Sequence, residues 1–168
     1  PPSSTPWLYH VGDSRLYCVN ADEATVLTVD HVPATQFAMQ GLLSEAEWQQ
    51  QVHAEDRSTI SQAFGMGSAM EGNGVLAREL LELTPDRLPP FLRHLQDRRP
   101  VNLVQDCVYL LATDGLWSFV DPLRAVARWP RILCRPDQPL DALLDDLFVD
   151  LIVASREEPS VDNATAIA

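Results

Sequence analysis

The sequence predicts an α+β domain, in which antiparallel strands and separate blocks of helix form layers around one core. Three strand-like runs open the chain, at residues 7–11, 15–19 and 24–29. The connections between them are too short for a crossover, so we expect an antiparallel meander. Helical segments then follow in blocks and do not alternate with single strands. This order favours an α+β arrangement over a doubly wound α/β sheet.

Two short helices are predicted after the meander. Residues 34–40 have helical character and are followed by a glycine. Ser44 and Glu47 form the Ser-x-x-Glu pattern of a capping box, which opens the second helix. Four glycines within residues 65–74 predict a mobile loop. Strand-like runs flank this loop at residues 58–64 and 75–83.

The second half of the chain contains the clearest helical periodicity. Apolar residues repeat at i, i+3, i+4, i+7 and i+8 from Leu140 onward, which predicts a helix that buries one stripe. Aspartates occupy the rest of its circumference and are interpreted as a solvated face. In order, this half predicts a helix at 87–98, strands at 101–104 and 107–112, a helix at 121–128 ended by Pro130, a helix at 140–152 and a strand at 164–168.

Length, composition and charge exclude several classes of protein. A chain of 168 residues suits one domain with its own core. Its apolar runs are too short to cross a bilayer. The net charge of −12 repels phosphate backbones, so we expect neither nucleic acid nor a membrane as partner. Residues 1–6 are interpreted as a linker or a cut end, because they are rich in proline and serine.

The three cysteines predict a cellular compartment. Cys18, Cys107 and Cys134 are odd in number, widely spaced and surrounded by apolar residues. This pattern is typical of buried free thiols in a reducing environment, so we expect a cytoplasmic protein. The oligomeric state is left open.

Three aspartates share one local context, in which a predicted strand meets a loop. Asp114 follows the apolar run at 107–112 and precedes Gly115, which permits a sharp turn. Asp13 follows the first strand, and Asp162 precedes the last one. An Asp-Gly pair by itself is most often only a turn. The three aspartates together suggest a site in which carboxylates converge.

Converging carboxylates need a cation, because they cannot all stay ionised at short distance without one. A set of oxygen ligands without Cys or His suits Mg²⁺ or Mn²⁺ and not zinc. The chemistry that such a site favours is metal-assisted displacement at phosphorus.

Five motifs in order resemble the PPM family, the PP2C-type metal-dependent serine/threonine phosphatases, and the bacterial members most of all. The similarity covers residues 8–168. The motifs are Gly12-Asp13-Ser14-Arg15, Leu27-Thr28-Val29-Asp30-His31, residues 60–65, residues 110–117 with Thr113-Asp114-Gly115-Leu116-Trp117, and Asp162-Asn163-Ala164-Thr165.

The resemblance implies a four-layer α-β-β-α sandwich, with two antiparallel sheets face to face, and a metal centre at one end. It implies that Asp114 and Asp162 are direct ligands of two Mg²⁺ or Mn²⁺ ions. Asp13 would share with Asp114 a third, more weakly held ion. Residues from about 32 to 74 would form helices and a mobile, flap-like loop near the site. Supporting or structural roles fall to Asn163, Gly115, Ser14 and Arg15.

The chain departs from the family pattern at its start. The first metal motif, Asp-Gly-His-Gly-Gly, is absent from the 168 residues, and with it the bridging aspartate and the histidine proposed as general acid. No acid role is transferred to the four histidines present. Ser118 stands where many relatives have a second acidic residue. We therefore expect a single PP2C-like domain that corresponds to the C-terminal two-thirds of a phosphatase domain.

Three functions remain open at this stage. The first is a metal-dependent protein phosphatase that hydrolyses phosphoserine and phosphothreonine through metal-activated water. Its substrates would be phosphoproteins of a bacterial serine/threonine kinase, and these 168 residues alone would be weak or inactive. The second is a non-catalytic PP2C-like regulatory or binding module. The third is a plain acidic domain that binds cations.

Overall fold

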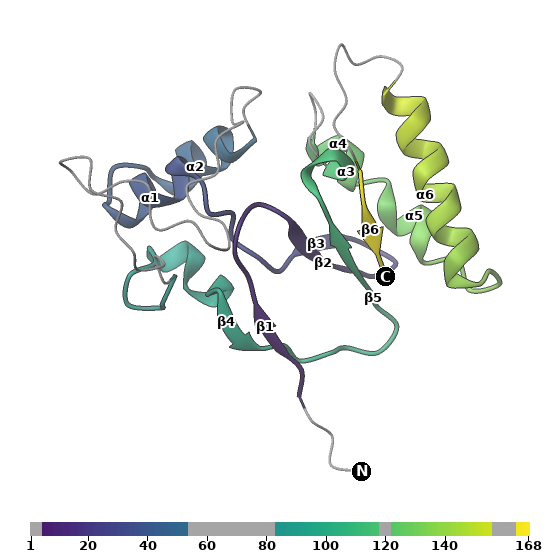
Figure 1. Cartoon of the computed structure of the whole chain (residues 1–168), viewed down its shortest axis with the longest axis horizontal. Helices are drawn as coiled ribbons and strands as arrows, with labels where there is room; N and C mark the ends of the chain where they lie inside the picture. The colour runs from purple at the N-terminus through teal and green to yellow at the C-terminus, as the bar shows by residue number, and fades with distance from the viewer. Residues whose placement is uncertain (1–4, 54–82, 118–121, 156–163) are drawn as a thin grey trace. The chain divides into compact units, whose positions relative to one another are not determined.

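The computed structural model describes residues 5–53, 83–117, 122–155 and 164–168 (Figure 1). The chain divides into two compact units. The first consists of Pro1–Asp13 and Thr28–Leu103, and the second of Ser14–Leu27 and Val104–Ala168. Each unit is built from segments that are far apart in the sequence.

The second unit contains a four-stranded sheet in which every neighbouring pair is antiparallel. Its central pair, β2 and β5, is in register from Arg15 opposite Ala112 to Val19 opposite Val108. The strands, in their order across the sheet, are β3 (Ala24–Val26), β2 (Arg15–Val19), β5 (Val108–Ala112) and β6 (Ala166–Ile167).

One face of this sheet forms the core of the second unit with helices that lie beside it in Figure 1. Tyr17 and Val19 alternate inward along β2, as the period of a strand requires. Leu143, Leu147 and Leu151 meet them from α6 at helical spacing. The helices are α3 (Asp114–Trp117), α4 (Pro122–Val126), α5 (Trp129–Leu133) and α6 (Leu140–Ser155).

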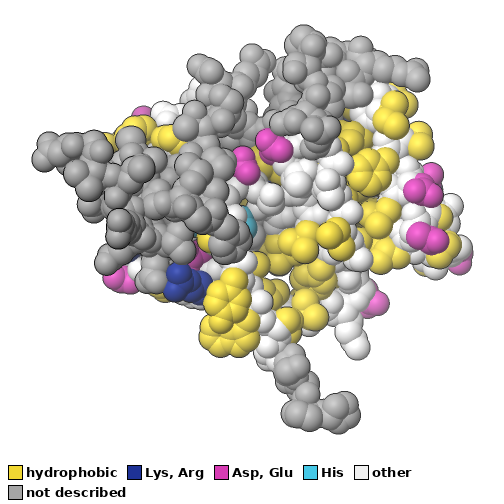
Figure 2. Space-filling model, in the orientation of Figure 1, with side chains coloured by type: hydrophobic (Ala, Val, Ile, Leu, Met, Phe, Trp, Pro, Cys, Tyr) yellow, Lys and Arg dark blue, Asp and Glu magenta, His cyan; other side chains and the backbone are white. Residues whose placement is uncertain are grey.

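The outer face of α6 carries the aspartates that the sequence assigned to solvent. Asp141 and Asp145 are exposed, and Figure 2 shows acidic side chains on this side of the molecule. Asp150 instead pairs with Arg128 at 3.0 Å, and Asp146 pairs with Arg135. Because Arg128 is partly exposed, that pair contributes little to stability, of the order of 0–1 kcal/mol.

The first unit pairs two short strands and surrounds its core with helices. Strands β1 (Trp7–Tyr9) and β4 (Arg98–Pro100) are antiparallel. Buried leucines from residues 83–95 pack with Val29, and the Trp48 ring contacts this cluster. The helices are α1 (Pro33–Met39), α2 (Glu45–Val52) and the 3₁₀ helix η1 (Pro90–Leu95).

The capping box predicted at the start of α2 is confirmed. The Glu47 N–H donates to Ser44 Oγ at 3.4 Å, and the Ser44 N–H donates to Glu47 Oε2 at 2.8 Å. The Ser44 hydroxyl, which donates to Glu47 Oε2 at 2.7 Å, and the Ser44 N–H lower the pKa of the Glu47 carboxyl below its ordinary value. Two amide groups that a helix start leaves without a partner are thereby satisfied.

The predicted opening meander is wrong for its first strand. β1 pairs with β4, whereas β2 and β3 pair with each other in the other sheet. Gly12 has a φ of +106°, and the chain passes there from the first unit to the second. Short connections favour sequential pairing, but the left-handed turn directs the chain away from β1 instead.

Three further predictions differ from the structure around prolines and strand partners. The helix predicted at 87–98 is the shorter η1, because Pro90 supplies no N–H and can only begin such an element. Pro130 likewise lies in the first turn of α5 and does not end a helix. Residues 101–104 are not a strand. Leu103 and Val104 are both 61% exposed, and β4 ends at Pro100, which pairs with Trp7 at the start of β1.

The α+β class with antiparallel sheets is confirmed within each unit. The strands predicted at 58–64 and within 75–82, and the glycine-rich loop at 65–74, lie outside the described residues. In the part of the chain that the structure describes, no helix is both long enough and apolar enough to cross a bilayer.

Candidate metal-binding turns

The Asp114 turn begins where β5 ends in the second unit. Leu110 and Ala112 are buried, which fixes the strand that leads to the turn. Asp114 is half-buried and opens α3, and its Oδ1 accepts a hydrogen bond from the Gly115 N–H at 2.9 Å. Its Oδ2 accepts none from any residue that the structure describes. One carboxylate oxygen of Asp114 is thus oriented by the backbone, and the other is available to a ligand.

Arg15 lies against the residues on both sides of this turn. It lies opposite Ala112 in the sheet, two residues before Asp114. Its guanidinium carbon lies 3.3 Å from the centroid of the Trp117 ring, three residues after Asp114. Arg15 is only 5% exposed, and its Nη1 also donates to the Tyr17 hydroxyl at 3.3 Å. A desolvated cation–π contact of this kind is worth about 2 kcal/mol.

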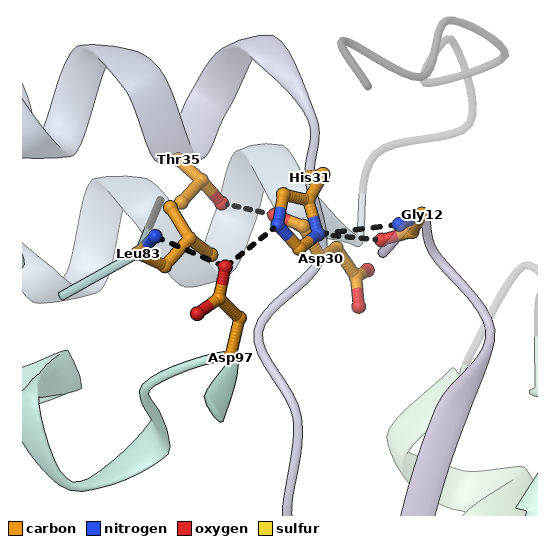
Figure 3. A network of polar contacts seen from close by, with 6 residues as sticks. All are labelled: Gly12, Asp30, His31, Thr35, Leu83 and Asp97. Carbon is orange, nitrogen blue, oxygen red and sulfur yellow. Dashed lines mark hydrogen bonds and ion pairs between the residues drawn. The ribbon is translucent and has the colours of Figure 1, made fainter. Parts of the chain in front are cut away.

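The Asp13 turn belongs to the first unit, and His31 holds the residue before it (Figure 3). The His31 N–H donates to the Gly12 carbonyl at 2.8 Å, and its ring Nδ1 lies 3.2 Å from the Gly12 nitrogen. Asp13 itself is half-buried, whereas Ser14 is exposed. The left-handed backbone at Gly12 explains the glycine, because a residue with a Cβ would be strained there.

The Asp97 carboxylate lies behind the His31 ring. Its Oδ2 is 3.8 Å from His31 Nε2 and accepts a hydrogen bond from the Leu83 N–H at 3.1 Å. Burial raises the pKa of Asp97. The His31 ring and the Leu83 N–H together lower it by more than burial raises it, so the pKa lies below its ordinary value. Asp97 is therefore a buried carboxylate that stays ionised near neutral pH.

The predicted site residues are only partly within the description. Asp162 and Asn163 lie outside the described residues. Asp13 and Asp114 lie in different units, each described by itself. Among the residues described, no three His, Cys, Asp or Glu side chains are grouped so as to hold a metal. The three-carboxylate site and the supporting roles of Gly115, Ser14, Arg15 and Asn163 stay predictions.

The donor chemistry at Asp114 fits the implied Mg²⁺ or Mn²⁺. A half-buried carboxylate with one oriented oxygen and one available oxygen is a hard ligand of the kind these ions prefer. Asp114 also lies two residues after the end of β5, where the paired strand fixes the position of the backbone.

Sequence reasoning missed three side-chain contacts around these turns. His31 belongs to the Asp30-His31 motif, so the motif was visible, but its contact with Gly12 across 19 residues was not. Asp97 lay within a run interpreted as helix and gave no signal of its own. Trp117 was part of the Asp-Gly motif, and only the structure places the Arg15 guanidinium over its ring.

The second unit thus has an antiparallel sheet that ends in an Asp-Gly turn, and the first unit has a Gly-Asp turn at Gly12. The fold is similar to that of three solved bacterial serine/threonine phosphatase structures. They are the PPM Ser-Thr phosphatase MsPP from Mycobacterium smegmatis in complex with cacodylate, the serine/threonine phosphatase of S. agalactiae and the serine/threonine phosphatase Stp1 from Staphylococcus aureus.

The similarity is one of fold. The TM-scores are 0.56, 0.54 and 0.54, with sequence identities of 19%, 23% and 18%, in the order given. The alignments cover 96%, 95% and 93% of this chain, but 53%, 51% and 47% of those chains. The chain thus spans about half the length of these bacterial phosphatases. No protein-family model and no curated protein sequence matches it.

Proposed function

We propose that this chain is part of a metal-dependent protein serine/threonine phosphatase that hydrolyses phosphoserine and phosphothreonine. The observation that carries the proposal is the Asp114-Gly115 turn at the end of a buried antiparallel strand, in a fold similar to bacterial PPM phosphatases. The complete fold would be the four-layer sandwich of two antiparallel sheets. The substrates would be phosphoproteins of a serine/threonine kinase in the bacterial cytoplasm.

The aspartates would hold the cations in this proposal. Asp114 and Asp162 would bind two Mg²⁺ or Mn²⁺ ions, and Asp13 would share a third with Asp114. When bound, such ions supply charge stabilisation at the phosphoryl oxygens and a water of lowered pKa. The chain's own contribution is placement, since the Gly115 N–H orients the Asp114 carboxylate and the Arg15 guanidinium stacks on Trp117 at the end of the same short helix.

A non-catalytic binding module is the second candidate, because similarity of fold at sequence identities of 19% and 23% is equally compatible with it. It would apply if the protein lacks the carboxylate that bridges two cations in the PPM family. A site without that carboxylate would bind cations less tightly and would turn over substrate weakly or not at all.

The test measures Mn²⁺ affinity and phosphatase activity of the same chain. We would compare the wild type with Asp114→Asn and with Asp145→Asn, a matched control on the exposed face of α6. Phosphopeptide hydrolysis that requires Mn²⁺ and is lost only in Asp114→Asn supports the enzyme. Mn²⁺ binding that depends on Asp114, without hydrolysis, supports the module or a plain cation-binding domain. Equal Mn²⁺ affinity in all three proteins would overturn the metal site.

A further inference from the structure

A buried polar network in the first unit has no part in the proposed ligand set. It connects Gly12, His31 and Asp97, three residues that are distant in the sequence (Figure 3). The His31 side chain is fully buried, and Asp97 is 5% exposed. Burying an imidazole and a carboxylate is costly unless their polar atoms are paired, so a buried pair of this kind calls for a reason.

The contact between His31 and Gly12 is double. The backbone of His31 donates to the Gly12 carbonyl, and the ring Nδ1 lies 3.2 Å from both the nitrogen and the oxygen of Gly12. A neutral ring with Nδ1 unprotonated accepts from the Gly12 N–H. A protonated ring donates from Nδ1 to the Gly12 carbonyl. The ring therefore has a partner on Gly12 in either state.

Asp97 fixes the other side of the ring. When Nδ1 accepts from Gly12, the proton of the neutral ring is on Nε2, and Nε2 faces Asp97 Oδ2 at 3.8 Å. That distance is too long for a hydrogen bond, and Nε2 has no hydrogen-bond partner among the described residues, so Asp97 acts on the ring through its charge. Asp97 is itself held by the Leu83 N–H, and its own carbonyl accepts from the His10 N–H at 3.0 Å.

The backbone that carries His31 is held as well. The Thr35 hydroxyl donates to the Asp30 carbonyl at 2.7 Å, and the Trp48 indole N–H donates to that hydroxyl at 3.1 Å. Helices α1 and α2 thereby fix the residue before His31. The His31 ring, its backbone and the Asp97 carboxylate are thus all held in place, and together they contact the Gly12 peptide.

We infer that His31 is a positioning residue, which with Asp97 holds the Gly12 peptide so that the next side chain, Asp13, is presented in one orientation. Gly12 has a φ of +106°, which a glycine adopts without strain. Glycine itself does not hold the backbone at that angle, so contacts from outside the turn must do so. This inference rests on the proposed function in so far as Asp13 is a metal ligand. The contacts that hold the Gly12 peptide do not depend on the proposed function. Residues that orient a ligand in this way typically change metal affinity ~10–100-fold when replaced.

A packing role alone makes different predictions from a positioning role. Asn at position 31 can place its amide oxygen near the position of Nδ1, and so can accept from the Gly12 N–H, but it cannot reach Asp97. Leu fills the space without any polar contact. If His31 only packs, both replacements should act alike. If it positions Gly12, His31→Asn should retain the slow exchange of the Gly12 amide and the Mn²⁺ affinity at Asp13, and His31→Leu should lose both.

The experiment uses the full chain labelled with ¹⁵N and titrated with Mn²⁺. Paramagnetic broadening of the Asp13 amide reports Mn²⁺ binding near this turn, and hydrogen exchange of the Gly12 amide reports how firmly the Gly12 peptide is held. The variants are His31→Leu, His31→Asn and Asp97→Asn. The control is His94→Gln, an exposed histidine of the same unit.

We expect His31→Leu to raise the Mn²⁺ midpoint at Asp13 by ~10-fold and to speed Gly12 exchange, and we expect His94→Gln to change neither. His31→Asn should have a Mn²⁺ midpoint and a Gly12 exchange rate close to those of the wild type. Asp97→Asn should have values between those of His31→Asn and His31→Leu. Equal losses in His31→Leu and His31→Asn, or no change in Gly12 exchange in either, would overturn the inference. If His31→Leu does not fold, His31→Asn and Asp97→Asn still decide the question through Gly12 exchange.

Failure of the proposed function looks different. Wild-type chain that shows no Mn²⁺ broadening at Asp13 or Asp114 would contradict the metal site. The Gly12 exchange rates of the variants would then still support or refute the positioning role by themselves.

Discussion

The Arg15 guanidinium lies over the face of the Trp117 indole, with its central carbon 3.3 Å from the ring centroid. Trp117 is 1% exposed, so little water competes with this contact. It connects the first residue of β2 to the last residue of α3. The Asp114 turn is therefore held by side-chain stacking as well as by the sheet.

Replacing Arg15 by lysine should destabilise the second unit by about 1–2 kcal/mol, because an ammonium group cannot stack its plane on the indole. Equilibrium urea unfolding, followed by tryptophan fluorescence, measures the change. Arg131→Lys, on the exposed side of α5, is the matched control and should lie within about 0.5 kcal/mol of wild type. Equal stability of Arg15→Lys and wild type would show that the stack contributes nothing.

Metal removal should lower stability if Asp114 is a ligand. A ligand at a hundred times its dissociation constant stabilises the folded state by about 2.7 kcal/mol. We expect Mn²⁺ to raise the midpoint of thermal unfolding and EDTA to reverse the rise. Asp114→Asn should respond much less, and Asp145→Asn should respond as wild type does. An equal rise in Asp114→Asn would place the bound cation elsewhere.

Acid should remove the stability that Asp97 contributes. Because its folded pKa is lowered, the folded state binds fewer protons than the unfolded state around that pKa. The contribution is complete above the unfolded pKa of an aspartate, about 4, and is lost as the pH falls through the folded value.

The Asp97→Asn variant tests this dependence. It should cost about 1–3 kcal/mol at pH 7, since the charge that orients His31 is gone, and the difference from wild type should shrink below about pH 4. Urea midpoints between pH 7 and pH 2.5 measure it, with Asp137→Asn as an exposed control. A difference that is independent of pH would mean that the Asp97 charge does not matter.

The capping box at α2 predicts a small, local effect. Ser44→Ala removes the acceptor for the Glu47 N–H and should cost about 1 kcal/mol. Gln49→Ala, on the exposed face of the same helix, should be neutral or slightly stabilising. Hydrogen exchange at the Glu47 amide locates the effect, and unchanged protection there would contradict it.

Local patterns in the sequence predicted most of the elements, and non-local pairing was what they missed. The alternation from Arg15 to Val19 and the leucine stripe of α6 are set by periodicity, and both appear where expected. The partner of β1 is some ninety residues away, and nothing in the Trp7–Tyr9 run specifies it. Leu103 and Val104 show the converse case, in which apolar residues without a partner strand stay exposed.

In the candidate site as well, local features were predicted from the sequence and non-local contacts were missed. Motif order predicted Asp13 and Asp114 as candidates, because the turn chemistry is local. It did not identify Asp97, since the value of a buried carboxylate lies in the ring that it faces, 66 positions earlier at His31. The Arg15–Trp117 stack was also beyond reach, because two segments must first pair before the contact exists.

The pairing of β2 with β5 also determines when this protein can fold. The two strands are roughly ninety residues apart, so closing that loop costs entropy that grows as about 1.5 RT ln n. During synthesis β2 leaves the ribosome long before β5, and Tyr17 and Val19 must wait in water for the strand and helices that cover them. We expect the slow step of refolding to be this closure, with the helices of the intervening segment forming first.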